Sequence, residues 1–198
     1  MVSFLYFAYG SNMLTTRLRA RCPSAEPLGL AYAQGYRLAF SKPGRDGSGK
    51  GHLTPARRSR QPGVLFSIDL AERDALDRAE GLGVGYDRVD DFAVRRAGTA
   101  AVVRASTYLA QQPAPALLPY DWYLALVIAG AREHGFDRRR IRALLATASL
   151  AHDDRPAHEA ALLRAADCGD DVAAYFAALE LWARPRRQST RASGLSLR

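Results

Sequence analysis

The N-terminal segment joins an apolar strand to a polar turn and the start of a helix, and no other segment constrains the fold as strongly. Residues 4–8 (Phe-Leu-Tyr-Phe-Ala) have the bulk expected of a buried strand. Tyr-Gly-Ser-Asn at residues 9–12 breaks this strand, and helical spacing resumes from Met13. Such a junction leaves several backbone N–H groups pointing one way. It predicts either an ordinary strand-to-helix turn or a nest that binds a small anion, for instance a carboxylate.

The rest of the pattern predicts an α+β protein, with strands dominating the first part of the chain and helices the last. Strands are expected at residues 35–40, 63–68, 86–94 and 101–109. Residues 41–62 are expected to form a loop because Gly, Pro, Ser and Arg are frequent there. Helices are expected at residues 69–80, 120–134, 138–148, 156–168 and 171–183.

Several of these helices carry end signals in the sequence. Asp69 and Glu72 have the spacing of a capping box, and Asp137 is expected to cap the helix that follows it. Gly81 and Gly135 are expected to end the helices before them. The helix over residues 120–134 is expected to present its apolar residues on one side.

Composition excludes several classes of protein. No apolar run reaches the ~18 residues that cross a bilayer, and the first residues show no secretion signal, so we expect a cytoplasmic protein without a membrane partner. The two cysteines, Cys22 and Cys168, suit a reducing compartment. The four histidines are scattered without metal-binding spacing, so we expect no metal and no cofactor.

The chain is basic, with a formal net charge of +8 that comes almost entirely from arginine. A basic chain suits anionic partners, nucleic acid included, but arginine also replaces lysine in proteins from GC-rich genomes. The arginines cluster at residues 57–60 and 184–187, and no aromatic residues are interleaved with them for stacking on bases. The pattern therefore disfavours nucleic acid as a partner.

Residues 44–51 (Gly-Arg-Asp-Gly-Ser-Gly-Lys-Gly) nearly match a phosphate-binding loop. Gly51 stands where Ser or Thr would hold the magnesium-bound hydroxyl, and the extended pattern of residues 52–55 gives no helix N-terminus behind the loop. We therefore expect no nucleotide site here, but a flexible loop beside the active site.

Glu80 breaks a local rule. It lies in the last turn of the helix over residues 69–80, where the negative end of the helix dipole disfavours a carboxylate. It is either an exposed helix-end residue that costs a few tenths of a kcal/mol or a residue kept for function. By contrast, Asp69 and Glu72 are explained as caps, and Asp74 and Asp77 as the solvated face of the helix.

Four segments in this order resemble the gamma-glutamylcyclotransferase family. They are residues 9–14 (Tyr-Gly-Ser-Asn-Met-Leu), 79–81 (Ala-Glu-Gly), 107–109 (Thr-Tyr-Leu) and 130–135 (Gly-Ala-Arg-Glu-His-Gly). The resemblance covers roughly residues 4–148 and implies a small mixed β-barrel of about five to seven strands flanked by helices, with a helical C-terminal segment. The expected domains are a catalytic domain at residues 1–150, a helical extension packed on it at 151–183, and a basic, flexible tail at 184–198.

The resemblance also implies an activity, a transferase- or lyase-type release of 5-oxoproline of the kind found in glutathione metabolism. In such enzymes the α-amine of a gamma-glutamyl amino acid or peptide attacks its own γ-carbonyl, and Glu80 matches the family's general acid/base. The implied substrate-binding residues are Tyr9, Gly10, Ser11, Asn12, Met13, Leu14, Tyr86 and Tyr108. Tyr86 and Tyr108 are expected to line the pocket and position Glu80, unless they are core tyrosines with satisfied hydroxyls.

Two alternatives remain open at this point. The leaving group could be a simple amine, as in a gamma-glutamylamine cyclotransferase, because the sequence does not reveal the pocket that holds it. The second alternative is a non-catalytic binding module whose tail contacts nucleic acid. Such a module would gain nothing from a buried acid at position 80. The expected partner is a small gamma-glutamyl substrate, and the protein is expected to be a monomer or a homodimer.

Overall fold

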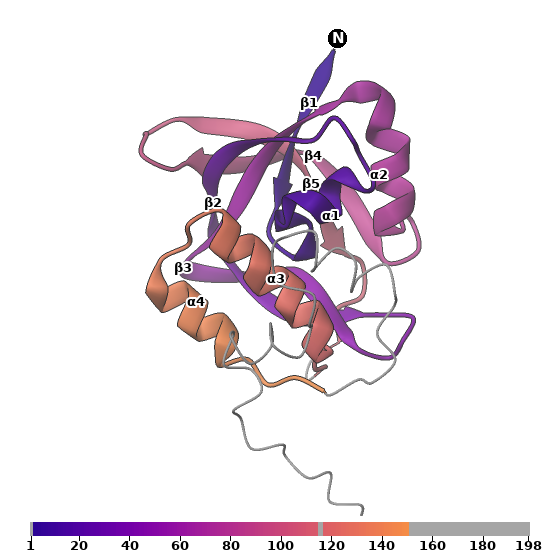
Figure 1. Ribbon diagram of the computed structural model, residues 1–198, viewed down its shortest axis with the longest axis vertical. Helices are drawn as coiled ribbons and strands as arrows, with labels where there is room; N and C mark the ends of the chain where they lie inside the picture. Colours follow the sequence, from indigo (N-terminus) through magenta and orange to yellow (C-terminus); the bar gives the residue numbers. More distant parts are fainter. Residues whose placement is uncertain (1, 115–116, 151–198) are drawn as a thin grey trace, which may run out of the picture.

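The chain folds around a closed five-stranded barrel in the order β1-β3-β2-β4-β5 (Figure 1). The structure is a computed structural model that describes residues 2–114 and 117–150. The strands are β1 Ser3–Ala8, β2 Glu26–Pro43, β3 Gly49–Asp69, β4 Tyr86–Arg96 and β5 Val102–Ala110. β1 pairs with β5 in parallel and the other neighbours are antiparallel. The prediction of an α+β fold with a small mixed barrel is therefore confirmed.

The helices pack against this barrel from outside. They are α1 Thr15–Arg19, α2 Arg73–Glu80, α3 Asp121–Glu133 and α4 Arg138–Leu145, with short 3₁₀ turns η1 Ser11–Met13 and η2 Leu70–Glu72. In Figure 1, α3 and α4 lie together on one side of the barrel, whereas α2 lies on another. Within the described ranges, none of these helices has the length and apolar content that crossing a bilayer requires.

Strand β1 is apolar along its length because both of its faces are buried. Phe7 packs inside the barrel with Leu65 and Phe92, whereas Phe4 and Tyr6 belong to a second core between the barrel and the helices. The strand that leads into the Tyr-Gly-Ser-Asn turn is therefore fixed from two sides.

Helix α3 differs from its prediction. The sequence favoured apolar residues on one side only, but every residue from Asp121 to Ala131 is buried. One cause is the close approach of η1: a Cβ at Gly130 would lie 2.4 Å from the backbone nitrogen of Leu14 and 2.6 Å from the carbonyl carbon of Met13. Glycine at this position lets α3 lie directly beneath the turn.

The predicted loop over residues 41–62 is wrong, because β3 begins at Gly49 and continues through Gln61. Pairing with β2 overrides the local composition, with Leu38 opposite Leu53 and Ala33 opposite Gln61. Pro55 is tolerated where the register shifts beside Gly35, which has a φ of 76°. The segment that resembles a phosphate-binding loop leads into a strand rather than a helix, as its sequence predicts.

The capping of α2 is only partly as predicted. The Asp69 carboxylate accepts a hydrogen bond from the N–H of Ala71, as an N-cap does. Glu72 does not close a capping box, because its carboxylate binds the N–H and the hydroxyl of Ser24. Gly81 ends the helix with a φ of 71°, as expected.

The other predicted elements within the described residues overlap the observed ones, but the strand expected at 35–40 covers only part of β2, which runs from Glu26 to Pro43. β4 and β5 match the strands expected at 86–94 and 101–109, and α3 ends beside Gly135. Asp137 caps α4 by accepting from the N–H of Arg140. The helices expected at 156–168 and 171–183, with the extension over 151–183 and the tail over 184–198, lie outside the described residues.

His52 of β3 gives the barrel a pH-dependent contact. Its Nδ1 accepts a hydrogen bond from the N–H of Ala110 at 3.0 Å, so the ring must be neutral at this nitrogen, and burial lowers the pKa of His52. In the unfolded chain His52 binds a proton below about pH 6.5, whereas in the folded chain, where its pKa is lower, it stays neutral. The free energy of unfolding therefore falls as the pH falls below this value.

We expect the His52→Gln variant to lose less stability than the wild type between about pH 7.5 and pH 5.5, because glutamine keeps an acceptor but does not titrate in this range. Urea denaturation at the two pH values measures the difference. Equal losses of unfolding free energy in both proteins would show that His52 does not contribute.

Candidate active site

The turn after β1 does not present its N–H groups as a complete nest. The N–H groups of Met13 and Leu14 bind the carbonyls of Gly10 and Ser11, and the N–H of Thr15 binds the carboxylate of Glu133 at 2.9 Å. Gly10 has a φ of −118°, so the turn does not use a left-handed conformation. The N–H groups of residues 13–15 are therefore not available to a ligand.

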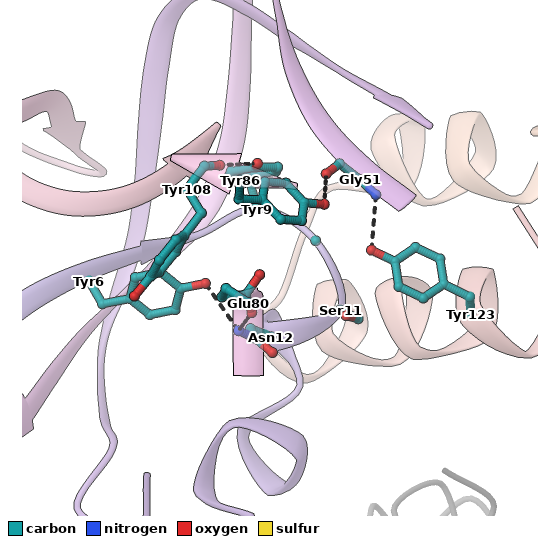
Figure 2. A pocket seen from close by; sticks show the side chains of 10 residues that line it. Tyr6, Tyr9, Ser11, Asn12, Gly51, Glu80, Tyr86, Tyr108 and Tyr123 are labelled. Carbon is teal, nitrogen blue, oxygen red and sulfur yellow. Dashed lines mark hydrogen bonds between the residues drawn. The ribbon is translucent and has the colours of Figure 1, made fainter. Parts of the chain in front are cut away.

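A small pocket lies between this turn, the end of α2 and the mouth of the barrel (Figure 2). Its lining residues are Tyr6, Tyr9, Gly10, Ser11, Asn12, Gly51, Glu80, Tyr86, Tyr108 and Tyr123. Seven of the nine residues proposed from the sequence thus surround one cavity of about 30 Å³. Met13 and Leu14 do not line it; their side chains are buried in the core, where they support the turn from behind.

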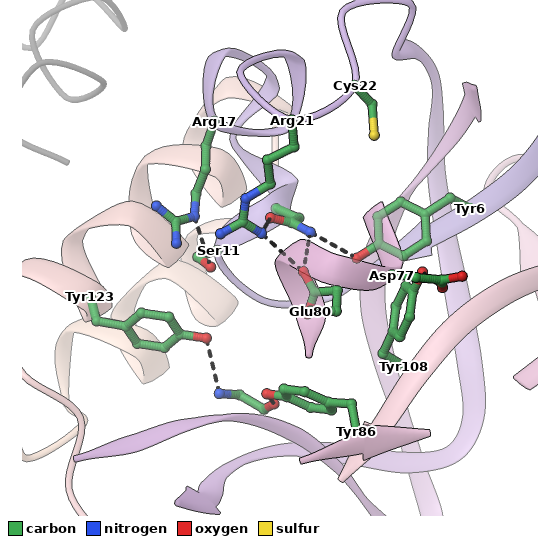
Figure 3. Close-up of polar contacts among 12 residues, drawn as sticks. Tyr6, Ser11, Arg17, Arg21, Cys22, Asp77, Glu80, Tyr86, Tyr108 and Tyr123 are labelled. Atoms are coloured by element: carbon green, nitrogen blue, oxygen red, sulfur yellow. Dashed lines mark hydrogen bonds and ion pairs between the residues drawn. The ribbon is translucent and has the colours of Figure 1, made fainter. Parts of the chain in front are cut away.

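Glu80 is held at one of its two carboxylate oxygens. Its Oε1 accepts hydrogen bonds from Nδ2 of Asn12 at 2.6 Å and from Nη1 of Arg21 at 3.0 Å (Figure 3). Arg21 also donates to Oδ1 of Asn12 at 2.6 Å, so the three side chains form a closed set of contacts. The guanidinium of Arg21 adds a positive charge beside this carboxylate at the C-terminal end of α2. Oε2 is the oxygen left for a ligand.

Five tyrosines surround this carboxylate, with Tyr6 and Tyr108 on one side and Tyr123 on the other in Figure 2. Burial raises the pKa of each tyrosine above its ordinary value, and the negative charge of Glu80 acts in the same direction. All five hydroxyls are therefore protonated at neutral pH and act as neutral hydrogen-bonding groups. Among the described residues that line the pocket, Glu80 carries the one carboxylate.

Tyr86 and Tyr108 line the pocket, but neither positions Glu80 through its hydroxyl. The hydroxyl of Tyr86 donates to the carbonyl of Gly51 at 2.6 Å, and that of Tyr108 donates to Oδ1 of Asp77 at 2.7 Å. Asp77 is also ion-paired with Arg88, so it is a partner of the barrel rather than part of a solvated helix face. Asn12 and Arg21 are the residues that position Glu80.

Sequence reasoning missed Arg21, Arg17, Tyr6, Tyr123 and Gly51. Arg17 and Arg21 are four residues apart and lie side by side next to the turn in Figure 3, and that spacing was the available signal. Arg17 is 7% exposed and donates to the Ser11 hydroxyl oxygen at 3.2 Å, and burial lowers the pKa of its guanidinium to about 9. Tyr6 could have been found from the alternation of β1, which turns its side chain away from that of Phe7.

The arrangement suits proton transfer. A carboxylate fixed at one oxygen and surrounded by neutral hydroxyls can accept a proton and return it. Within residues 2–114 and 117–150, no three His, Cys, Asp or Glu side chains come together in a way that could hold a metal ion.

Comparison with known proteins gives consistent matches. Residues 62–144 match the model of the AIG2-like family. Gamma-glutamylcyclotransferase from Bos taurus is 31% identical over 139 residues, which cover 67% of this chain and 72% of the bovine protein. The Homo sapiens gamma-glutamylcyclotransferase matches with the same identity and coverage.

Solved structures agree on the fold. A gamma-glutamyl cyclotransferase structure superposes with a TM-score of 0.75 at 24% identity, covering 85% of this chain and all of that one. An uncharacterized Homo sapiens protein superposes with a TM-score of 0.74 at 24% identity, covering 83% of this chain and 98% of the other. The similarity to these proteins therefore includes the fold as well as the sequence.

The protonated tyrosines give a direct test of the pocket. At about pH 11 we expect the native protein to show less tyrosinate absorbance than the same chain in urea, because burial keeps the pocket hydroxyls protonated beyond the ordinary tyrosine pKa of about 10. An alkaline titration followed in the near ultraviolet measures this. Superimposable native and unfolded titration curves would contradict the buried arrangement.

Proposed function

This chain belongs to the gamma-glutamylcyclotransferase family, and we propose that it releases 5-oxoproline from a gamma-glutamyl compound. The proposal rests on one observation: Glu80 and the turn over residues 9–12 line the same pocket. The two come from distant parts of the chain, and Asn12 joins them by a direct hydrogen bond to Glu80.

The proposed reaction needs one group that first takes a proton and then gives it back. The α-ammonium of the substrate transfers a proton to Glu80, and the free amine nitrogen attacks the γ-carbonyl carbon. The new carbon–nitrogen bond closes a five-membered ring, and the bond from that carbon to the leaving amine breaks. Glu80 returns its proton to the leaving nitrogen and then carries the second proton of the ring nitrogen to the same group, so that the amine departs as an ammonium. The products are 5-oxoproline and an amine, and neither water nor a covalent enzyme intermediate takes part.

The contacts of Glu80 support this role. Because its described hydrogen bonds all fall on Oε1, the carboxylate has a fixed orientation and Oε2 is the oxygen that exchanges the proton. Ring closure gains from holding the two reacting groups of a single molecule close together, which is proximity catalysis. The hydroxyls of Tyr6 and Tyr123 accept hydrogen bonds from Asn12 and Gly51, so their own hydrogens can donate to the oxyanion that forms at the γ-carbonyl.

We assign the α-carboxylate of the substrate to the turn over residues 9–12. The Ser11 hydroxyl oxygen accepts from Arg17, and the Ser11 side chain is also hydrogen-bonded to Tyr123, so a substrate carboxylate that accepts from Ser11 takes the place of Tyr123. The guanidinium groups of Arg17 and Arg21 lie next to this turn and give it a positive potential (Figure 3). The backbone N–H groups of Met13 and Leu14 take no part, because they are bound within the turn.

We expect Glu80→Gln to lower kcat by about 100-fold or more, because glutamine keeps the size of the side chain but cannot take a proton. The release of 5-oxoproline from a gamma-glutamyl amino acid measures the effect, and circular dichroism checks the fold. Asp74→Asn is the matched control, since Asp74 is an exposed acid on the same helix. A Glu80→Gln enzyme that keeps most of its activity would refute the assignment.

The nucleophile is tested separately with a blocked substrate. Acetylation of the substrate's α-amine removes the nucleophile but leaves both the α-carboxylate and the γ-carbonyl in place. We expect the acetylated compound to give no turnover, as measured by chromatography of the products. Release of N-acetylglutamate from it would point to an attacking water and therefore to a hydrolase.

A further inference from the structure

The chain contains two lysines, and they lie opposite each other beside the active-site pocket. Every other basic residue apart from the histidines is an arginine. Lys42 near the end of β2 is the register partner of Lys50 near the start of β3. Like charges directly opposite each other destabilise a strand pair, so this pairing breaks a local rule in the way that functional residues do.

The two ammonium groups have different surroundings. Nζ of Lys50 donates to Oδ2 of Asp46 at 2.7 Å and to the Ser48 hydroxyl at 2.8 Å, and it lies 4.8 Å from the ring centres of Trp122 and Tyr123. Its charge is therefore matched. Lys42, by contrast, has no carboxylate within ion-pairing distance among the residues that the structure describes.

Lys42 lies at the pocket rather than on a distant surface. Its Nζ is 5.1 Å from the ring centre of Tyr86, which lines the pocket. Gly85 leaves room for it, since a Cβ there would lie 2.8 Å from this nitrogen. Burial lowers the pKa of the Lys42 ammonium, and the negative charges of Glu80 and Asp46 partly oppose that effect.

The size of the cavity says where a ligand must extend. At about 30 Å³ it encloses only a small part of a ligand, so the rest of the ligand must extend beyond the residues that line it. Tyr86 is one of these residues, and the unmatched ammonium of Lys42 lies beside its ring. A partly desolvated cation without a counter-ion attracts an anionic group more strongly than an exposed one does.

We propose that Lys42 determines leaving-group specificity by binding a carboxylate on the departing amine. This inference rests on the proposed function and selects among its substrates: the leaving group is an amino acid or peptide with a free carboxylate rather than a simple amine. Lys50 fixes the start of β3 through Asp46 and leaves Lys42 as the ammonium that the substrate neutralises.

The test uses two substrates that differ in one group, gamma-glutamyl-alanine and gamma-glutamyl-alaninamide, with 5-oxoproline release as the readout. We expect the wild type to prefer the carboxylate by about tenfold or more in kcat/KM, and Lys42→Met to lose most of that preference. Lys42→Arg keeps a cation and should keep part of it. Arg58→Met removes an exposed charge from β3 and should leave the preference unchanged.

The possible outcomes distinguish a failure of the inference about Lys42 from a failure of the proposed function. If neither substrate gives 5-oxoproline with the wild type, the proposed function fails and the inference fails with it. If both are turned over but the wild type has no preference, or Lys42→Met keeps the full preference, the inference is overturned and the function stands. A preference that falls as sodium chloride is added supports the ion pair, because salt screens a partly exposed charge contact.

Discussion

Glu80, Asn12 and Arg21 meet at the end of α2, and the organisation of the site depends on their contact. The hydrogen bond from Asn12 spans 68 residues of sequence and the ion pair from Arg21 spans 59. A carboxylate at the C-terminal end of a helix is electrostatically unfavourable, so Glu80 needs donors from another element. Because the turn after β1 and the segment that follows α1 supply them together, Glu80 and the proposed substrate-binding turn cannot be placed independently.

The surrounding fold holds both partners in place. On one side, Gly130 lets α3 approach the turn, the carboxylate of Glu133 binds the N–H of Thr15, and the His134 ring contacts the carbonyl of Met13 at 3.0 Å. On the other side, Asp77 of α2 is bound by Tyr108 of β5 and Arg88 of β4. The barrel thus orients the helix that carries Glu80, and α3 orients the turn whose Asn12 is hydrogen-bonded to Glu80.

Much of the fold and of the candidate site could be predicted from the sequence. The predictions succeeded where the signal is local and failed where it depends on contacts between distant residues. The strand–turn–helix junction and the helix-end glutamate have strong local signals, and the structure brings them to one pocket. The length of β3 could not be predicted, because Gly, Pro and Arg favour a loop locally and pairing with β2 overrides them. Arg21 was not identified from the sequence, because its role depends on a carboxylate 59 residues away. The pairing of Lys42 with Lys50 follows from strand register, which a single sequence does not specify.

The central claim is that Glu80 exchanges a proton with the α-amine of a substrate held by the turn. A crystal structure of the Glu80→Gln variant with a bound gamma-glutamyl amino acid tests this most directly. The decisive quantity is the distance from the substrate's α-nitrogen to the nearest terminal atom of the residue-80 side chain. A distance of about 2.6–3.2 Å, with the α-carboxylate at the turn over residues 9–12, is the result we predict. A gamma-glutamyl group bound elsewhere, or one whose amine points away from residue 80, would contradict it.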